Sequence, residues 1–129
     1  MKSPIWLLQK DAYQRITKET AYKVYDDDPE QPIYPYIRTG EFDARPWSDK
    51  TRPGQEVLFK LHFWSQYPGK KEVAEMMDAV LKILTAAYPA LGSDFNVVFQ
   101  DMETNQIIID IDGTTRHGIL DMRYLIEEL

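Results

Sequence analysis

Two carboxylates late in the chain are the residues whose type and spacing could carry chemistry. Asp110 and Asp112 follow an apolar run in the stretch QIIIDIDGTT, residues 106–115. A carboxylate can attack a phosphoryl group when a bound metal ion such as Mg²⁺ screens the negative charge. A metal-dependent phosphatase is therefore one hypothesis for the function of this chain.

The same stretch resembles the first motif of haloacid-dehalogenase-type phosphatases. That resemblance implies that Asp110 is the nucleophile and Asp112 the acid and base, both beside Mg²⁺. In that family the motif ends the first strand of a large parallel sheet, and a lysine and further acidic residues lie downstream. The residues after Thr115 are too few for even one βαβ unit of about 30 residues. We therefore favour the alternative, in which Asp112-Gly113 makes a tight turn between two strands.

The other residue types that bind metals show no ligand spacing. Asp26–Asp28 could hold a cation through carboxylate oxygens, but the run does not have the spacing of an EF-hand loop and is more typical of a solvated loop. His62 and His117 are the two histidines, and we expect His62 on the less buried face of its strand and His117 near a turn. The chain has no cysteine, which excludes thiol catalysis and cysteine zinc sites. No phosphate loop or nucleotide fingerprint is present. The sequence therefore predicts no catalytic residue, metal or cofactor.

Composition narrows the class of protein further. The chain has 129 residues, of which 43% are hydrophobic and 28% charged, as in one ordinary globular domain. Its net charge is −6 with scattered Lys and Arg, which disfavours binding to nucleic acid through phosphates. It contains no apolar run long enough for a membrane span and no signal peptide pattern. We expect a single domain that is made in a cytoplasm and binds neither membranes nor specific nucleic acid sequences.

Residues 53–73 hold the clearest strand, a turn and the start of the clearest helix. The strand alternates between the two faces of an extended chain, as a half-buried strand does. Its apolar face consists of Val57, Phe59, Leu61 and Phe63. Leu58 and Trp64 interrupt the polar face, which predicts that a helix or another subunit partly covers it. The helix expected over 70–88 carries a stripe of Val73, Met76, Met77, Val80, Leu84 and Ala87.

The remaining elements define the fold class. We expect a helix over 4–18, because Ser3 can cap its start and Pro4 suits its first turn. Strands are expected over 21–25, 36–43, 95–102, 106–110 and 115–126, with a proline-rich loop after the first. The order of helix, strands, helix and strands predicts an α+β domain. In it, the N-terminal and central helices pack on one face of a mainly antiparallel sheet.

Residues 44–54, ARPWSDKTRPG, are expected to form a long loop or hairpin arm between two strands. Long arms in compact domains are often functional. Its mixed charges and its tryptophan predict contacts with a neighbouring subunit or partner, although Trp47 could instead fold back onto its own domain. The candidate interface residues are Arg45, Trp47, Asp49, Lys50 and Arg52 of the arm, and Trp64 of the central strand.

The chain as a whole, from about Ile5 to Ile126, resembles a family of short proteins from tailed bacteriophages and prophages. The resemblance rests on the order and spacing of several short pieces, none of which is specific. These pieces are Val24-Tyr25-Asp26, Pro35-Tyr36-Ile37, Lys50-Thr51 before Gly54-Gln55-Glu56, Leu61-His62-Phe63-Trp64-Ser65, Gly69-Lys70-Lys71-Glu72-Val73 and Thr115-Arg116-His117-Gly118. The family comprises tail completion or tail terminator proteins, including the tail-to-head joining type.

The resemblance implies a structural role in the virion. Such proteins are expected to form a hexameric ring on the head-proximal end of the tail tube, contacting the tube protein on one side and the head-tail connector on the other. Two alternatives stay open at this point. One is a head-completion or connector adaptor, or another small minor tail protein, and the other is the phosphatase built on Asp110 and Asp112.

Overall fold

The computed structural model describes residues 2–48 and 51–129 as two helices and five strands. The helices each have an apolar stripe at helical spacing, and the strands of the centre alternate between two faces. In chain order the elements are α1 (Ile5–Glu19), β1 (Lys23–Tyr25), β2 (Tyr36–Ser48), β3 (Pro53–Ser65), α2 (Lys71–Thr85), β4 (Phe95–Ile109) and β5 (Arg116–Glu128).

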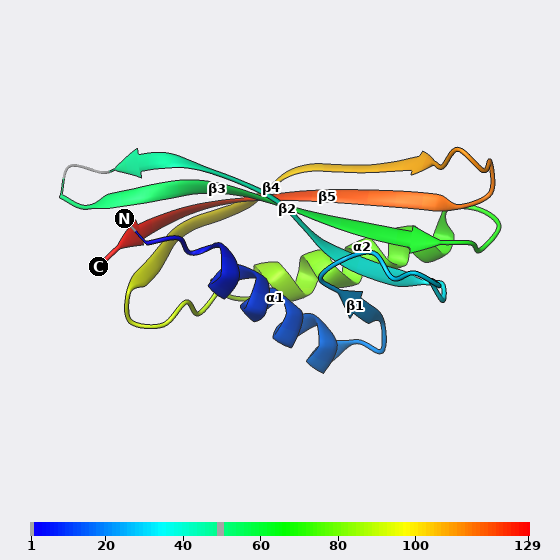
Figure 1. Cartoon of the computed structure of the whole chain (residues 1–129), viewed down its shortest axis with the longest axis horizontal. Coiled ribbons are helices and arrows are strands. Elements are labelled where there is room, and N and C mark those ends of the chain that lie inside the picture. The colour runs from blue at the N-terminus through cyan, green and yellow to red at the C-terminus, as the bar shows by residue number, and fades with distance from the viewer. Residues whose placement is uncertain (1, 49–50) are drawn as a thin grey trace.

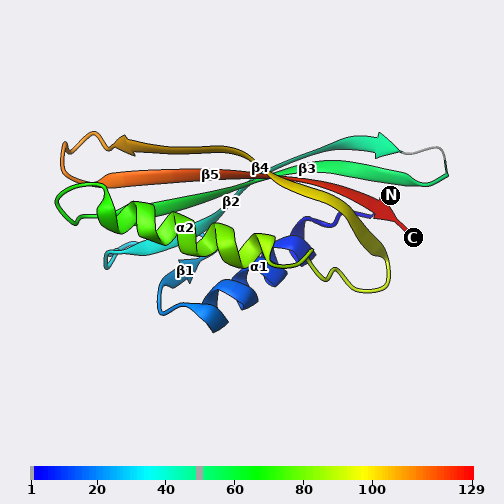
Figure 2. The same cartoon turned by 180° about the vertical axis from the view of Figure 1, so that it is seen from behind.

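The strands form one sheet in the order β1-β2-β3-β5-β4. Only the short pair of β1 and β2 is parallel, and the other three pairs are antiparallel. Both helices lie on the same face of this sheet, and the β2–β3 and β4–β5 hairpins extend to opposite ends (Figure 1, Figure 2). The prediction of an α+β domain with both helices on one face of a mainly antiparallel sheet is confirmed.

The hydrophobic core lies between the two helices and the sheet. Val57, Phe59, Leu61 and Phe63 have no exposed surface, so the alternation expected for the central strand is confirmed. The predicted stripe of α2 is buried from Val73 to Leu84, whereas Ala87 lies beyond the end of the helix and is exposed. No helix among residues 2–48 and 51–129 is long and apolar enough to cross a membrane.

Two strand predictions were wrong. β2 continues to Ser48 rather than ending near Asp43. Of the two forms expected for residues 44–54, the hairpin arm is therefore the one observed, and most of its described residues belong to β2 and β3. Residues 95–109 form one strand rather than two, and the polar residues Glu103–Asn105 continue it. Polar residues in a row are typical of a turn, which is why two strands were predicted. β4 lies at the edge of the sheet, however, and it keeps its backbone hydrogen bonds to β5 even where its side chains are exposed. A register shift between Met102 and Thr104 accommodates one extra residue there.

Gly118 of β5 lies directly beneath α2, where there is no room for a side chain. A Cβ atom at this position would collide with Sδ of Met77 and lie 3.0 Å from Cγ2 of Val73. We expect Gly118→Val to lower the free energy of unfolding by about 1–3 kcal/mol, because an overpacked core shifts its helix. Urea unfolding followed by fluorescence measures this loss. Gly118→Val should cost less stability when Met77→Ala is already present, because the shorter side chain leaves room for valine. A double variant that loses more stability than the two single variants together would contradict the steric explanation.

The two ends of the chain lie together, close to the β2–β3 hairpin (Figure 1). The backbone N–H of Lys2 donates a hydrogen bond to Oε1 of Glu128 at 3.2 Å. The Lys2 ammonium is 3.1 Å from a carboxylate oxygen of Asp94. The N-terminal segment is thereby fixed against Asp94, which precedes β4, and against Glu128, the last residue of β5.

Candidate interaction surface

The β2–β3 hairpin extends beyond the helices as an arm (Figure 1). Trp47 lies opposite Gly54 in the neighbouring strand and is half-buried over it. A Cβ atom at Gly54 would lie 3.0 Å from the Trp47 ring and would collide with the carbonyl oxygen of Ile126. Glycine therefore allows β3 to approach both the indole and β5 at this point.

The charged residues predicted for the arm have different environments. The Arg45 guanidinium is 3.2 Å from Asp43 and 3.5 Å from Glu56, and its side chain is 60% exposed. Arg52 is also exposed. Asp49 and Lys50 were predicted as interface residues as well, but they lie outside the described residues.

The face of the sheet that carries no helix is lined by cross-strand charge pairs. Arg123 of β5 donates to a carboxylate oxygen of Glu56 at 2.7 Å, and Lys60 pairs with Asp121 at 3.2 Å. Opposite charges in facing positions stabilise neighbouring strands, each by a fraction of a kcal/mol when exposed. The middle of this face therefore carries paired charges beside the half-buried Leu58.

Histidines and aromatic rings occupy the far end of the same face. The Trp64 and His117 rings stack with centroids 3.7 Å apart. His62 Nδ1 is 2.7 Å from His117 Nε2, and His62 Nε2 is 2.8 Å from Oε1 of Glu41. We call Glu41, His62, Trp64 and His117 the histidine cluster. The indole N–H of Trp64 has no hydrogen-bond partner among the described residues.

The histidine cluster is arranged to keep His117 uncharged. Partial burial, with a contribution from the adjacent His62, lowers the pKa of His117 from 6.5 to about 4. The hydrogen bond from His62 lowers the pKa of the Glu41 carboxyl. The described residues contain no group of three or more His, Cys, Asp or Glu side chains placed to hold a metal ion.

The structure separates Trp64 from Arg45 and Trp47 of the arm. Trp64 lies in the histidine cluster, level with Tyr36, whereas Trp47 lies level with Gly54 near the tip of the arm. Ten residues of β3 separate the two levels, which is about 33 Å along a strand. The arm and Trp64 therefore belong to two different regions of one sheet face.

Asp110 and Asp112 lie in the turn between β4 and β5. Asp112 accepts hydrogen bonds from the backbone N–H groups of Thr114 and Thr115 and from the Thr115 hydroxyl. These bonds, the hydroxyl contact first, lower the pKa of Asp112 to about 2. Asp110 accepts a bond from the backbone N–H of Ile111. Both carboxylates thus act as turn-forming groups, and the structure supports the turn interpretation of this motif.

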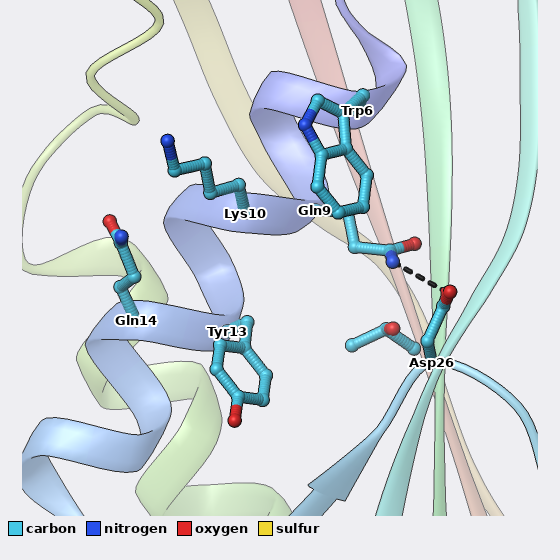
Figure 3. Close-up of a pocket in the computed structure, with 7 residues that line it drawn as sticks. Trp6, Gln9, Lys10, Tyr13, Gln14 and Asp26 are labelled. Atoms are coloured by element: carbon cyan, nitrogen blue, oxygen red, sulfur yellow. Dashed lines mark hydrogen bonds between the residues drawn. The ribbon is translucent and has the colours of Figure 1, made fainter.

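A groove along the outer side of α1 was not recognised from the sequence. Figure 3 shows Trp6 and Tyr13 standing on the helix near Asp26, which accepts a hydrogen bond from Gln9 at 2.6 Å. The groove has a volume of about 380 Å³, and the two rings are 64% and 46% exposed. The sequence did contain one indication of this groove, because Trp6 and Tyr13 fall outside the apolar stripe of α1.

The comparisons with known proteins decide which family this architecture represents. The family model for tail completion protein gp17 matches residues 6–127 of the chain. The chain belongs to this family. Tail completion proteins are structural components of the phage virion, and this agrees with the resemblance seen in the sequence.

Individual relatives support the assignment. The chain is 31% identical, over 100 residues, to the tail completion protein gp17 of Bacillus phage SPP1, and the alignment covers 78% of this chain and 70% of the relative. The solved structure of bacteriophage SPP1 gp17 superposes with a TM-score of 0.59 at 23% identity, covering 96% of this chain and 95% of the other. A chain in the virion of a native gene transfer agent particle has the same fold, with a TM-score of 0.86 at 22% identity and coverage of 98% and 99%.

Proposed function

We propose that this tail completion protein forms a ring, of about six subunits, on the head-proximal end of a finished tail tube. The ring stops growth of the tube and presents its other side to the head-tail connector. The observation that carries this proposal is the family match over nearly the whole chain. The net charge of −6 supports it, because an acidic or neutral lumen lets DNA pass without binding it.

The shape of the subunit supports a head-to-tail contact between copies. A closed ring requires two different surfaces on each subunit, one of which meets the other on the next copy. The arm extends away from the helices and carries a half-buried tryptophan and exposed arginines. Such mixed polar and aromatic residues fix register between subunits and are enriched at interfaces.

The test is mass in solution by light scattering at low and high protein concentration, with negative-stain images of the same samples. Rings, either free or on the ends of added tails, are expected. A protein that remains monomeric and leaves added tails uncapped would contradict the ring. That result would favour the alternative of a connector adaptor or another minor tail protein.

The arm makes a separate prediction. We expect Trp47→Ala and Arg52→Ala each to reduce ring formation and joining of tails to heads, because both residues lie at the proposed contact between subunits. Trp6→Ala is the matched control, since it removes an exposed tryptophan that belongs to α1 and not to the arm. Rings and joined particles are counted by negative stain. Unchanged counts for both arm variants would exclude the arm from the contact.

A further inference from the structure

β4 is an edge strand that exposes apolar side chains. It is the last strand of the sheet and pairs only with β5. Five apolar side chains on it are between 37% and 54% exposed, namely Val98, Phe99, Met102, Ile108 and Ile109. An open strand edge has a row of unpaired N–H and C=O groups and is a template for another strand.

β4 lacks the residues that usually protect an edge. Its sequence FNVVFQDMETNQIII contains no lysine, arginine or proline. Two register shifts interrupt its first part, between Val97 and Phe99 and between Met102 and Thr104. From Thr104 to Ile109 the strand is regular, and this part ends in the exposed Ile108 and Ile109. Therefore Thr104–Ile109 is well suited to accept a further strand.

The opposite side of the sheet has a second open edge. β1 pairs with β2 only from Tyr36 to Arg38. Among the described residues, no strand pairs with the outer side of β2 from Thr39 to Ser48. A register shift interrupts β2 between Thr39 and Phe42, so the regular part of this open edge runs from Phe42 to Ser48. Within it, Pro46 has no N–H group to donate.

The directions of the two open edges match. β2 is antiparallel to β3, β3 to β5, and β5 to β4. β2 and β4 therefore run in opposite directions, so that placing β2 of one copy beside β4 of another creates an antiparallel pair. Closing a sheet around an axis requires neighbouring strands to be staggered. A stagger would bring Thr104–Ile109 beside the open half of β2 and away from β1.

We propose that β4 of one subunit pairs with the open half of β2 of the next subunit, so that the sheets of neighbouring copies join edge to edge around the ring. This inference rests on the ring of the proposed function and identifies its contact. Pairing between two β4 strands is disfavoured, because their only charged residues, Asp101 and Glu103, are both acidic. A contact between two β4 strands would also produce a closed dimer. A contact between β2 and β4 instead leaves one free strand edge at each end of the assembly until the ring closes.

Because the chain has no cysteine, disulfide crosslinking can test this contact directly. Asp43→Cys is combined in turn with Thr104→Cys, Gln106→Cys or Ile108→Cys, three positions that alternate along β4 and share the helix-free face with Asp43. Within one subunit β2 and β4 are three strand spacings apart, about 14 Å, so an intramolecular disulfide cannot form. The single-cysteine variants are the matched controls.

Under conditions that give rings, we expect one of the three double variants to form a ladder of disulfide-linked oligomers on a non-reducing gel. The single variants should stay monomeric. Rings without a ladder in any double variant would overturn the pairing but leave the ring. A dimer from Gln106→Cys by itself would indicate β4–β4 contact and overturn the pairing. If the parent chain forms no ring, free or on tails, the proposed function fails together with the inference.

A second variant needs no crosslink. Ile108→Lys places a charge on the open edge, where it disfavours a further strand, and its side chain is already exposed. We expect an increase of about tenfold or more in the protein concentration needed for rings, without a change in Tm. The control is Ile111→Lys in the turn outside the strand, where the side chain is 100% exposed. Equal ring formation by both lysine variants would contradict the pairing.

Discussion

Replacing Phe59 with alanine is expected to lower the free energy of unfolding by about 3–5 kcal/mol. Phe59 has no exposed surface and stacks on Phe42 of β2 with ring centroids 4.4 Å apart. Its removal leaves a cavity in the hydrophobic core and deprives Phe42 of its stacking partner. Because the stability of a small domain is about 5–15 kcal/mol, the variant should keep its fold but unfold roughly 10–20 °C lower. Thermal unfolding followed by circular dichroism measures the shift.

Leu58→Ala is the matched control for Phe59→Ala. It is the adjacent residue of the same strand, but it points to the helix-free face and is only half-buried. We expect a loss of about 1 kcal/mol, since fewer contacts disappear and no closed cavity forms. If the two variants lost equal stability, the assignment of the two faces of β3 would be wrong.

Acidification is expected to destabilise the fold through His117. In the folded protein its pKa is about 4, below the ordinary value of 6.5. Between these two pH values the unfolded chain binds more protons than the folded one, so the free energy of unfolding falls as the pH is lowered from about 6.5 to about 4. Glu41 acts in the same direction at lower pH, because its lowered pKa favours the folded state only while the carboxyl is ionised. The loss from His117 is about 1–2 kcal/mol, since solvent partly screens this half-buried ring.

His117→Gln separates this effect from general acid denaturation. Glutamine keeps a polar group beside His62 but does not titrate. Urea unfolding of both proteins at pH 7.5, 6.0 and 5.0 and constant ionic strength should give a shallower decline for the variant. Parallel declines in the two proteins would show that the histidine cluster does not control the pH dependence.

Elements with strong periodicity could be predicted from the sequence. The stripes of the two helices and the alternation of β3 reflect burial against one core, and each is visible in a single segment. Most of β4 was predicted, but as two strands over 95–102 and 106–110. Its continuity and the exposure of its apolar side chains could not be predicted in this way, because no strand among the described residues pairs with its outer edge. Ile107–Ile109 resemble a buried strand, yet Ile108 and Ile109 are more than 40% exposed. A local sequence shows which residues are hydrophobic, but it does not show whether the surface that they contact belongs to the same chain.

The histidine cluster was beyond prediction for a related reason. His62 does lie on the helix-free face, as expected, but it is only 6% exposed, because Glu41 and His117 cover it. Their contact depends on the register of β3 against β5 and on the irregular pairing of β2 between Thr39 and Phe42. Neither register is encoded in residue spacing within one strand. Trp47 was easier to single out, because a tryptophan in a segment rich in proline and charge has few local partners.

The meeting of the two chain ends beside the arm has a practical consequence for imaging. Lys2 and Glu128 are hydrogen-bonded, so a small fluorescent or electron-dense tag would leave the subunit at nearly the same place from either terminus. In the ring proposed above, the labels would mark one height along the tail axis, whichever end carries them. Tagged particles would show directly whether the arm end of the subunit points to the capsid or to the tail tip.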